Sequence, residues 1–298
     1  MHDNIQKIAQ EAQLAMLYEV TCINKPGLVD PVDPGSHQDM DIFTFLQSSV
    51  VLTPYFEEFI QTGLDRQHQP IEETFMAIRQ IGLEAETAMF SVTNGINTHK
   101  GAIFSLGIFL AICGRLTIWK VPCKKSFFQK EIQKMTKNLL NDFGKIDQTK
   151  PKAWTWGEYL FVNHGLTGIR GEAKRGYPCV FDRGLPYYQA YQGSQQDKMI
   201  DTLLFLSMEV EDTNLIKRSN NRHVFEEYQL LIRPYFELGG VKTIQGKKYL
   251  DYLNQQFKKK NWSIGGSADL LILTIFLDKI MDKGWLCYTI IHYFVLVS

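Results

Sequence analysis

The most restrictive feature of this sequence is the run from Ala102 to Cys113, which is apolar except for Ser105 and Gly107. A helix that is apolar on every side cannot face water and has to be surrounded by other elements. We therefore expect a central helix here. Gly114 is expected to be its C-terminal cap, because glycine readily takes the left-handed conformation that ends many helices.

Two long segments have the pattern expected of helices that pack around this central helix. Residues 3–20 and 71–92 each place apolar side chains at steps of three and four, which is typical of helices with one buried face. Strand-like alternation is scarce, and no repeat, low-complexity tract or linker divides the chain. We predict an all-α fold: a single multi-helix domain over residues 1–298, with an active site built from inter-helix loops and an atypical hydrophobic tail at 278–298.

The charge balance restricts the function. The chain has 298 residues, and its 32 Lys and Arg equal its 32 Asp and Glu. Broad binding of nucleic acid needs a surplus of basic residues, so the balance argues against a general polyanion binder. Five cysteines without paired metal-type spacing, and a start without a secretory pattern, predict reduced thiols in a cytoplasmic protein. The apolar segment 284–298 is short for a membrane helix, which needs about 20 residues, so we expect a buried terminal segment and no membrane.

The loop Asn97-Thr98-His99-Lys100-Gly101 enters the central helix. Thr98 is expected to cap this helix, which leaves His99 and Lys100 in its first turn. A cation there is unfavourable unless an anion binds to the free N–H groups. A phosphate cradle made with Lys100 and Gly101 is one interpretation. Two solvated side chains are the other, and the spacing favours neither.

A second polar cluster, residues 35–41, precedes another helix. Ser36 suits its N-cap and Asp39 its third position, which leaves His37 and Asp41 without a structural role. Residues two apart point to different faces of a helix, so Asp39 and Asp41 are not expected to chelate one ion together. Either can join a Mg²⁺ site with acids from elsewhere, since Mg²⁺ usually takes one or two carboxylates plus substrate phosphates.

Glu19 falls inside the apolar stripe of residues 3–20. A carboxylate on an apolar face needs a partner or takes a raised pKa. The structural interpretation is an ion pair inside the bundle, with Lys25 or an arginine. The functional interpretation is a positioned general base or a ligand for a sugar hydroxyl.

Three further segments carry polar residues between helices. The glycine-rich stretch 265–269 suits either an N-cap at Ser267 or a phosphate cradle. The acids of 209–214 end a helix where negative charge is disfavoured, which suggests a nearby cation. Residues 170–172 form a mixed-charge turn. The sequence lacks GxGxxG, GxxxxGK[ST], HExxH and GxSxG, which argues against the commonest nucleotide folds, zincins and serine hydrolases.

Taken together and in order, six blocks resemble one known family. They are EVTCINKPGLVD (19–30), GSHQDMD (35–41), NGINTHKGAIFSLG (94–107), GEAKRGYP (171–178), EDTNLIKR (211–218) and GGSADLL (265–271). They are similar to the signature blocks of triphosphoribosyl-dephospho-CoA synthases, which make the prosthetic-group precursor of citrate lyase; a sister form serves malonate decarboxylase. The resemblance covers nearly the whole chain. One departure is Asn24, where the family usually has a proline.

The resemblance implies an all-α fold and a Mg²⁺-dependent pentosyl transfer from ATP to 3′-dephospho-CoA. The 2′-hydroxyl of the dephospho-CoA ribose attacks C1′ of the ATP ribose, adenine leaves, and the triphosphate stays on the product. Such a displacement passes through an oxocarbenium-like state, which requires a base for the hydroxyl and negative charge near C1′. The product is then expected to pass to the holo-acyl-carrier transferase of citrate lyase. The sequence is also compatible with a homodimer.

We assign candidate roles on that basis. The catalytic candidates are Glu19, Glu86 and His99, with either glutamate as the base or the oxocarbenium stabiliser. The Mg²⁺ candidates are Asp39, Asp41 and Asp212. The phosphate candidates are Lys25, His99, Lys100 and Arg170. The other substrate-binding candidates are Ser36, His37, Asn97, Thr98, Asn214, Gly265, Gly266, Ser267 and Asp269.

Three alternatives stay open at this point. One is the malonate decarboxylase paralogue, with the same chemistry. Another is a helical, Mg²⁺-dependent hydrolase of ADP-ribosyl or nucleotide substrates. The third is a non-catalytic binding protein, such as a chaperone for the acyl carrier, which would require the polar clusters to be solvated surface.

Overall fold

The computed structural model describes residues 2–116 and 124–282, and every regular element in this part of the chain is helical. The α-helices are α1 (His2–Thr21), α2 (Ile42–Val51), α3 (Thr53–Asp65), α4 (Ile71–Val92), α5 (Lys100–Leu116), α6 (Lys125–Met135), α7 (Trp156–His164), α8 (Gly168–Arg175), α9 (Leu185–Ala190), α10 (Gln195–Glu209), α11 (Thr213–Ser219), α12 (Val224–Glu237), α13 (Ile244–Lys260) and α14 (Gly265–Asp282). The short 3-10 or π segments are η1 (Leu139–Lys145), η2 (Pro151–Ala153), η3 (Cys179–Gly184) and η4 (Gly240–Lys242). The predicted all-α fold is confirmed.

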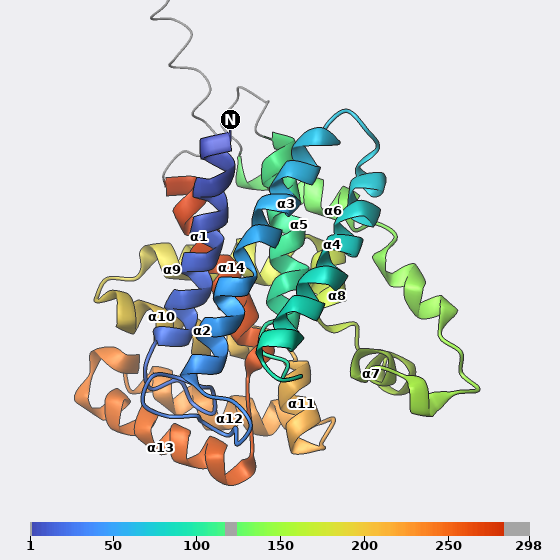
Figure 1. Cartoon of the computed structure of the whole chain (residues 1–298). Helices are drawn as coiled ribbons and strands as arrows, with labels where there is room; N and C mark the ends of the chain where they lie inside the picture. The colour runs from blue at the N-terminus through green and yellow to red at the C-terminus, as the bar shows by residue number, and fades with distance from the viewer. Residues whose placement is uncertain (1, 117–123, 283–298) are drawn as a thin grey trace, which may run out of the picture.

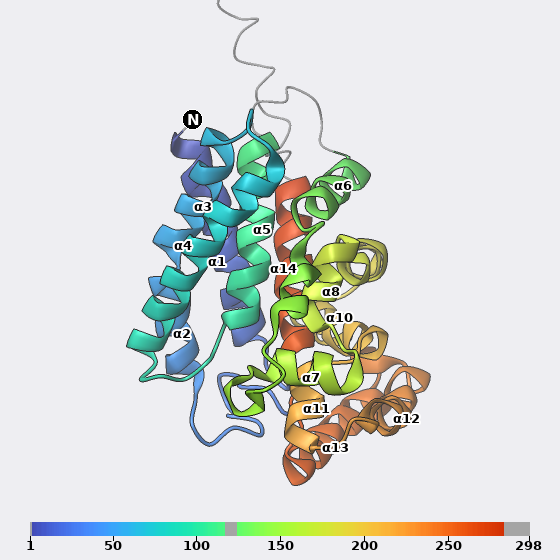
Figure 2. The same cartoon turned by 90° about the vertical axis from the view of Figure 1, so that its right-hand side faces the viewer.

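Helix α5 lies at the centre, as its apolar sequence predicts. From Ala102 to Gly114 every residue except Phe104 is buried. Helices α3 and α4 pack against one side of α5, and α14 runs along another (Figures 1 and 2). Helices α6 and α8 also contact α5, and α10 packs on α14. The buried side chains form one core that continues from α1 to α14. The central helix is therefore enclosed by its neighbours, as a helix that is apolar on every side requires.

Two glycines allow α3 and α5 to approach closely. A Cβ atom on Gly114 would collide with the carbonyl of Ile60 in α3, and one on Gly63 would collide with the carbonyl of Ala111 in α5. The predicted C-cap at Gly114 is wrong, because α5 continues to Leu116. Close packing of two helices requires this glycine, since a well-packed core has no space for the extra carbon.

The helix predicted to begin at Ser36 is α2, which begins only after Asp41. The Asp41 carboxylate is the N-cap and accepts the N–H of Thr44 at 2.9 Å. Ser36 lies in the preceding loop, where the guanidinium of Arg218 binds its carbonyl oxygen. Ser36 therefore has a partner in a distant helix, and the local capping pattern contained no sign of this contact.

The start of α5 also differs from the prediction. The side-chain oxygen of Asn97 accepts the N–H of Lys100 at 3.1 Å, so Asn97 takes the capping role predicted for Thr98. The Thr98 hydroxyl instead donates to Ser48 of α2 at 2.8 Å. Thr98 therefore ties the start of the central helix to its neighbour.

The loop between α1 and α2 departs from the family's pattern at Asn24. This residue has a φ of 61°, and its N–H donates to the carboxylate of Asp30 at 2.8 Å. Proline has a φ near −65° and no N–H, so it could not replace Asn24 in this conformation. The backbone at Asn24 is in the left-handed region, which asparagine tolerates better than most residues.

The structure describes three of the five cysteines and the first residues of the hydrophobic C-terminal tail, 278–282. Cys22, Cys113 and Cys179 are buried and carry reduced thiols. Within residues 2–116 and 124–282, no helix has the length and apolar composition needed to cross a membrane. Cys123, Cys287 and the predicted buried segment 284–298 lie outside the described residues.

Candidate active site

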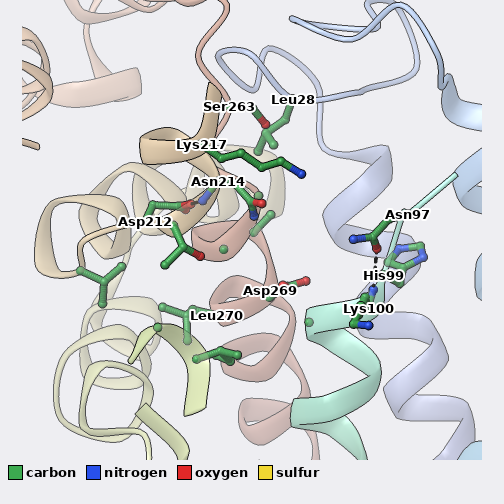
Figure 3. Close-up of a pocket in the computed structure, with 18 of the residues that line it drawn as sticks. Leu28, Asn97, His99, Lys100, Asp212, Asn214, Lys217, Ser263, Asp269 and Leu270 are labelled. Carbon is green, nitrogen blue, oxygen red and sulfur yellow. Dashed lines mark hydrogen bonds between the residues drawn. The ribbon is translucent and has the colours of Figure 1, made fainter. Parts of the chain in front are cut away.

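A cavity of about 670 Å³ opens where the N-terminal ends of α5, α8 and α14 face the loop between α1 and α2. Polar side chains project into it from the start of α5 on one side and from α11 and α14 on the other (Figure 3). Its volume is in the usual range for pockets that bind small ligands. All six sequence blocks contribute residues to its wall.

Most of the predicted site residues meet in this cavity. Those that line it are Glu19, Lys25, His37, Asp39, Asn97, Thr98, His99, Lys100, Asp212, Asn214, Gly265, Gly266 and Asp269. Those that do not line it are Ser36, Asp41, Glu86, Arg170 and Ser267. The structure thus brings together segments that are far apart in the sequence.

Three of the residues outside the cavity have other contacts. Glu86 forms an ion pair with Lys100 at 2.7 Å. Arg170 stacks its guanidinium over the ring of Phe143, with 5.2 Å to the ring centroid. Glu86 and Arg170 line a smaller groove beside α4 and α5. Asp41 is exposed and occupied as the cap of α2.

Glu19 and Lys25 form a buried ion pair at the cavity wall. The Lys25 ammonium lies 2.5 Å from Glu19 Oε1 and 2.7 Å from the Glu19 carbonyl oxygen. Their side chains are 4% and 1% exposed, respectively. The ion-pair interpretation of Glu19 is confirmed, and the Lys25 ammonium is already bound by this chain's own oxygens.

Both carboxylate oxygens of Asp212 already accept two hydrogen bonds each from the protein. Its Oδ1 accepts the N–H groups of Asn214 at 2.9 Å and Leu215 at 3.3 Å. Its Oδ2 accepts the N–H and hydroxyl of Ser267 at 2.7 and 2.9 Å. Burial raises the pKa of Asp212, and these hydrogen bonds oppose the shift. Ser267 lies inside the first turn of α14, so its predicted N-cap role is wrong, and Asp212 joins the starts of α11 and α14.

The acids at the end of α10 are paired with arginines. Glu209 forms a two-pronged contact with Arg183 at 2.8 Å, and Glu211 contacts Arg222 at 2.8 Å. The cation suggested by this acidic helix end is therefore provided by arginine side chains of the chain itself.

Lys217 is a cavity-lining cation that the sequence did not single out. Among the other cations at the wall, Lys100 pairs with an acid, Arg175 pairs with Glu172, and Arg218 binds oxygens of Ser36 and Asn261. In the described residues, Lys217 has no ion-pair or hydrogen-bond partner. Its side chain extends from α11 across the cavity (Figure 3). The only available sequence signal was its place in the block 211–218.

Both cavity histidines are neutral near neutral pH. His99 is buried; its Nδ1 lies 2.7 Å from the hydroxyl of Ser48, and its Nε2 has no partner among the described residues. Burial, helped by a nearby lysine, lowers the pKa of His99 to about 3. His37 Nε2 lies 3.2 Å from Ser263 Oγ, and burial lowers the pKa of His37 to about 4.

The N–H groups at the start of α5 are mostly engaged by the protein. The His99 N–H points to the sulfur of Met89 at 3.3 Å, and the Lys100 N–H is bound by the capping asparagine. The N–H of Ala102 is close enough to the carboxylate of Asp269 to lower its pKa. Of the two interpretations of this helix start, the phosphate cradle is disfavoured, because the Asp269 carboxylate lies against Gly101.

The acids predicted to bind Mg²⁺ do not form a chelating set. Asp41 lies outside the cavity, Asp212 is saturated with donors, and Asp39 lies at the rim with 64% of its side chain exposed. Across residues 2–116 and 124–282, no group of three or more His, Cys, Asp and Glu side chains could hold a metal ion. The side chains present do not fit a Mg²⁺ site built by the protein alone.

Comparison with known proteins identifies the family. A profile described as ATP:dephospho-CoA triphosphoribosyl transferase matches residues 5–287. This chain belongs to that family. The match confirms the resemblance carried by the six blocks, and it makes the chain a transferase.

Two relatives show how far the family similarity extends. Protein CitXG of Leuconostoc mesenteroides subsp. cremoris is 40% identical over 279 residues, which cover 93% of this chain and 60% of that protein. A probable 2-(5′′-triphosphoribosyl)-3′-dephosphocoenzyme-A synthase of Lactiplantibacillus plantarum is 40% identical over 276 residues, covering 92% of this chain and 97% of the relative. No solved structure matches the chain.

Proposed function

We propose that this chain joins the triphosphoribosyl group of ATP to the ribose 2′-hydroxyl of 3′-dephospho-CoA and releases adenine. The observation that carries the proposal is the polar cavity of about 670 Å³, to which every family block contributes. The named relative from Lactiplantibacillus plantarum matches this chain over nearly its whole length, which supports the same reaction here.

The triphosphate lies against Lys217. This ammonium is available in the cavity, whereas that of Lys25 is buried and bound by Glu19. A flexible lysine is a good point charge for phosphate oxygens. Lys100, with 52% of its side chain exposed, can add a second contact by leaving its rim ion pair with Glu86. These two residues replace Lys25 and Arg170 in the phosphate-binding role.

The glutamates considered as bases have structural partners. Glu19 neutralises Lys25 and thereby fastens the first residues of the loop to the end of α1. Glu86 lies outside the cavity, where it holds Lys100. A base for the attacking hydroxyl has to be sought among the other acids of the wall.

His99 serves as a neutral hydrogen-bond donor. The Ser48 hydroxyl accepts a hydrogen bond from Thr98, and we assign its own proton to the contact with His99 Nδ1, 2.7 Å away. A neutral imidazole whose Nδ1 accepts carries its proton on Nε2. That buried N–H has no protein partner in the described residues, so it donates to a lone pair of the bound substrate. Its low pKa makes it a positioning donor and not a proton source.

Magnesium enters the cavity on the phosphates of ATP. This arrangement needs few protein ligands, since Mg²⁺ commonly keeps several waters and binds through substrate phosphates. Asp39 at the rim is the one acid of the predicted set that both lines the cavity and is exposed; its carboxylate lies 3.9 Å from Nδ1 of His37.

The chemistry at the cavity is the same for a citrate lyase or a malonate decarboxylase precursor. We retain delivery to the holo-acyl-carrier transferase of citrate lyase, a cytoplasmic location and a homodimer as proposals. The hydrolase alternative differs at the cavity itself, because water would replace the dephospho-CoA hydroxyl as nucleophile.

The test is adenine release from ATP and Mg²⁺ with and without 3′-dephospho-CoA. The proposed transferase releases adenine only when dephospho-CoA is present. Equal release in both reactions, or release of inorganic phosphate or free ribose phosphate, would establish the hydrolase instead.

A further inference from the structure

Asp269 differs from the other acids that line the cavity. Glu19 is bound to a lysine, and Asp212 accepts hydrogen bonds from four donors. Glu172, Glu209 and Glu211 are each paired with an arginine. Asp39 lies exposed at the rim. Among the described acids that line the cavity, Asp269 alone combines a position inside the cavity with a carboxylate that has no ion pair and no hydrogen bond to a side chain.

The position of Asp269 is fixed from two sides. It lies in the second turn of α14 and points across the cavity towards the start of α5 (Figure 3). The N–H of Ala102 is close enough to lower the pKa of its carboxylate. A Cβ atom on Gly101 would collide with Asp269 Oδ2, so the glycine provides the space that the carboxylate occupies. Helix α14 and the space left by Gly101 thus place the carboxylate at the cavity wall, where a substrate can reach it.

We propose that the Asp269 carboxylate is the general base that takes the proton of the attacking ribose 2′-hydroxyl. This inference rests on the proposed function. The hydroxyl oxygen forms a bond to C1′ of the ATP ribose while the bond from C1′ to adenine N9 breaks. The O–H proton goes to Asp269, and the electron pair of the broken bond leaves with adenine. Adenine takes up a proton, so the overall reaction consumes none.

The surroundings of Asp269 suit this role. Burial, together with the nearby carboxylates of Asp212 and Glu19, raises its pKa well above the ordinary value, and the N–H of Ala102 opposes the shift. A base works best when its pKa lies near the working pH, because it is then deprotonated and still accepts a proton readily. An anionic group beside C1′ also stabilises positive charge that develops on the ribose.

The experiment compares wild type with Asp269→Asn, a variant of nearly equal shape. General base catalysis typically contributes about 10²–10⁴ in rate, so we expect kcat to fall by at least about 100-fold with little change in the KM for ATP. The low-pH limb of the kcat profile should disappear in the variant. Asp269→Asn should fold at least as stably as wild type, because it removes a carboxylate that neighbouring acids repel.

Asp278→Asn is the matched control. Asp278 lies on the same helix, does not line the cavity and binds Gln189 at 3.0 Å, so its variant should retain wild-type kcat. Gly101→Ala leaves Asp269 itself in place but should still lower kcat, because the added carbon displaces the Asp269 carboxylate.

The outcomes separate this inference from the proposed function. If wild type releases adenine and Asp269→Asn turns over normally, Asp269 is not the base. If excess Mg²⁺ restores the variant's turnover, the carboxylate binds metal and the inference is overturned. If wild type itself releases no adenine, the proposed function fails before Asp269 is tested.

Discussion

The ammonium of Lys25 lies 2.5 Å from a carboxylate oxygen of Glu19, and the pair is closed off from solvent. Removing one partner leaves the other charged and buried, which typically costs about 3–5 kcal/mol. We expect Lys25→Met to lower the free energy of unfolding by this amount, measured by urea titration. The double variant Lys25→Met with Glu19→Gln should recover much of the loss. If Glu19→Gln abolishes turnover while stability is unchanged, the carboxylate acts in catalysis.

Lys217 provides a test of where the triphosphate binds. A hydrogen bond to a charged group is worth about 1.5–3 kcal/mol, so Lys217→Ala should raise the KM for ATP at least about tenfold. The side chain is exposed and unpaired in the described part of the chain, so the melting temperature should not change. Lys248→Ala, at an exposed position of α13 outside the cavity, is the control. Equal KM values for both variants would place the triphosphate elsewhere.

The two cavity histidines make stability depend on pH. Burial holds the pKa of His99 at about 3 and that of His37 at about 4 in the folded protein. Their unfolded pKa is about 6.5, so as the pH falls below that value the unfolded chain takes up protons first. Stability present at neutral pH is therefore lost through this window, by about 1 kcal/mol per pH unit for each histidine. Urea unfolding at several pH values measures the loss, and His99→Gln should reduce its slope. If stability depends on pH equally in wild type and His99→Gln, His99 takes up protons as readily in the folded protein as in the unfolded chain.

The absence of a chelating set in the described residues predicts weak magnesium binding without nucleotide. Titration calorimetry of the protein with Mg²⁺ alone should give no saturable site at micromolar concentrations, whereas turnover with ATP should depend on Mg²⁺. A tight, stoichiometric site in the absence of ATP would contradict this account.

Gly114 provides a test of the packing between α3 and α5. Overpacking a core typically costs about 1–3 kcal/mol, so Gly114→Ala should destabilise the protein by that amount. Gly82→Ala is the matched control, because a Cβ atom on Gly82 of α4 meets nothing within 4 Å. That change should stabilise the helix by about 0.5–1 kcal/mol. Both are measured by urea unfolding, and equal effects would mean that the helices have room to separate.

Periodicity predicted the helices better than local motifs predicted their ends. The apolar run 102–113 and the stripe 71–92 gave the positions of α5 and α4, because burial of a face leaves its period in the sequence. The caps at Ser36 and Ser267 were wrong because each residue is held by a distant partner, Arg218 or Asp212. Such partners depend on tertiary packing, and a local pattern does not contain them.

For the candidate site too, the sequence predicted position better than side-chain contacts. The six blocks located the cavity wall, but which charges remain unpaired depends on the folded arrangement. Lys25 seemed suited to phosphate and is occupied by Glu19, whereas Lys217 resembled an ordinary lysine favoured at a helix C-terminus. Asp269 was among the predicted substrate ligands, but its lack of a side-chain partner in the described residues became visible only beside the paired acids.

The central claim is that this cavity breaks the bond between C1′ and adenine while the triphosphate stays intact. Mass spectrometry of the products from ATP, Mg²⁺ and 3′-dephospho-CoA tests it most directly. We predict free adenine in equal amount to a dephospho-CoA adduct that carries one added ribose and three phosphates. An adduct with fewer phosphates, or adenine without any adduct, would contradict the account.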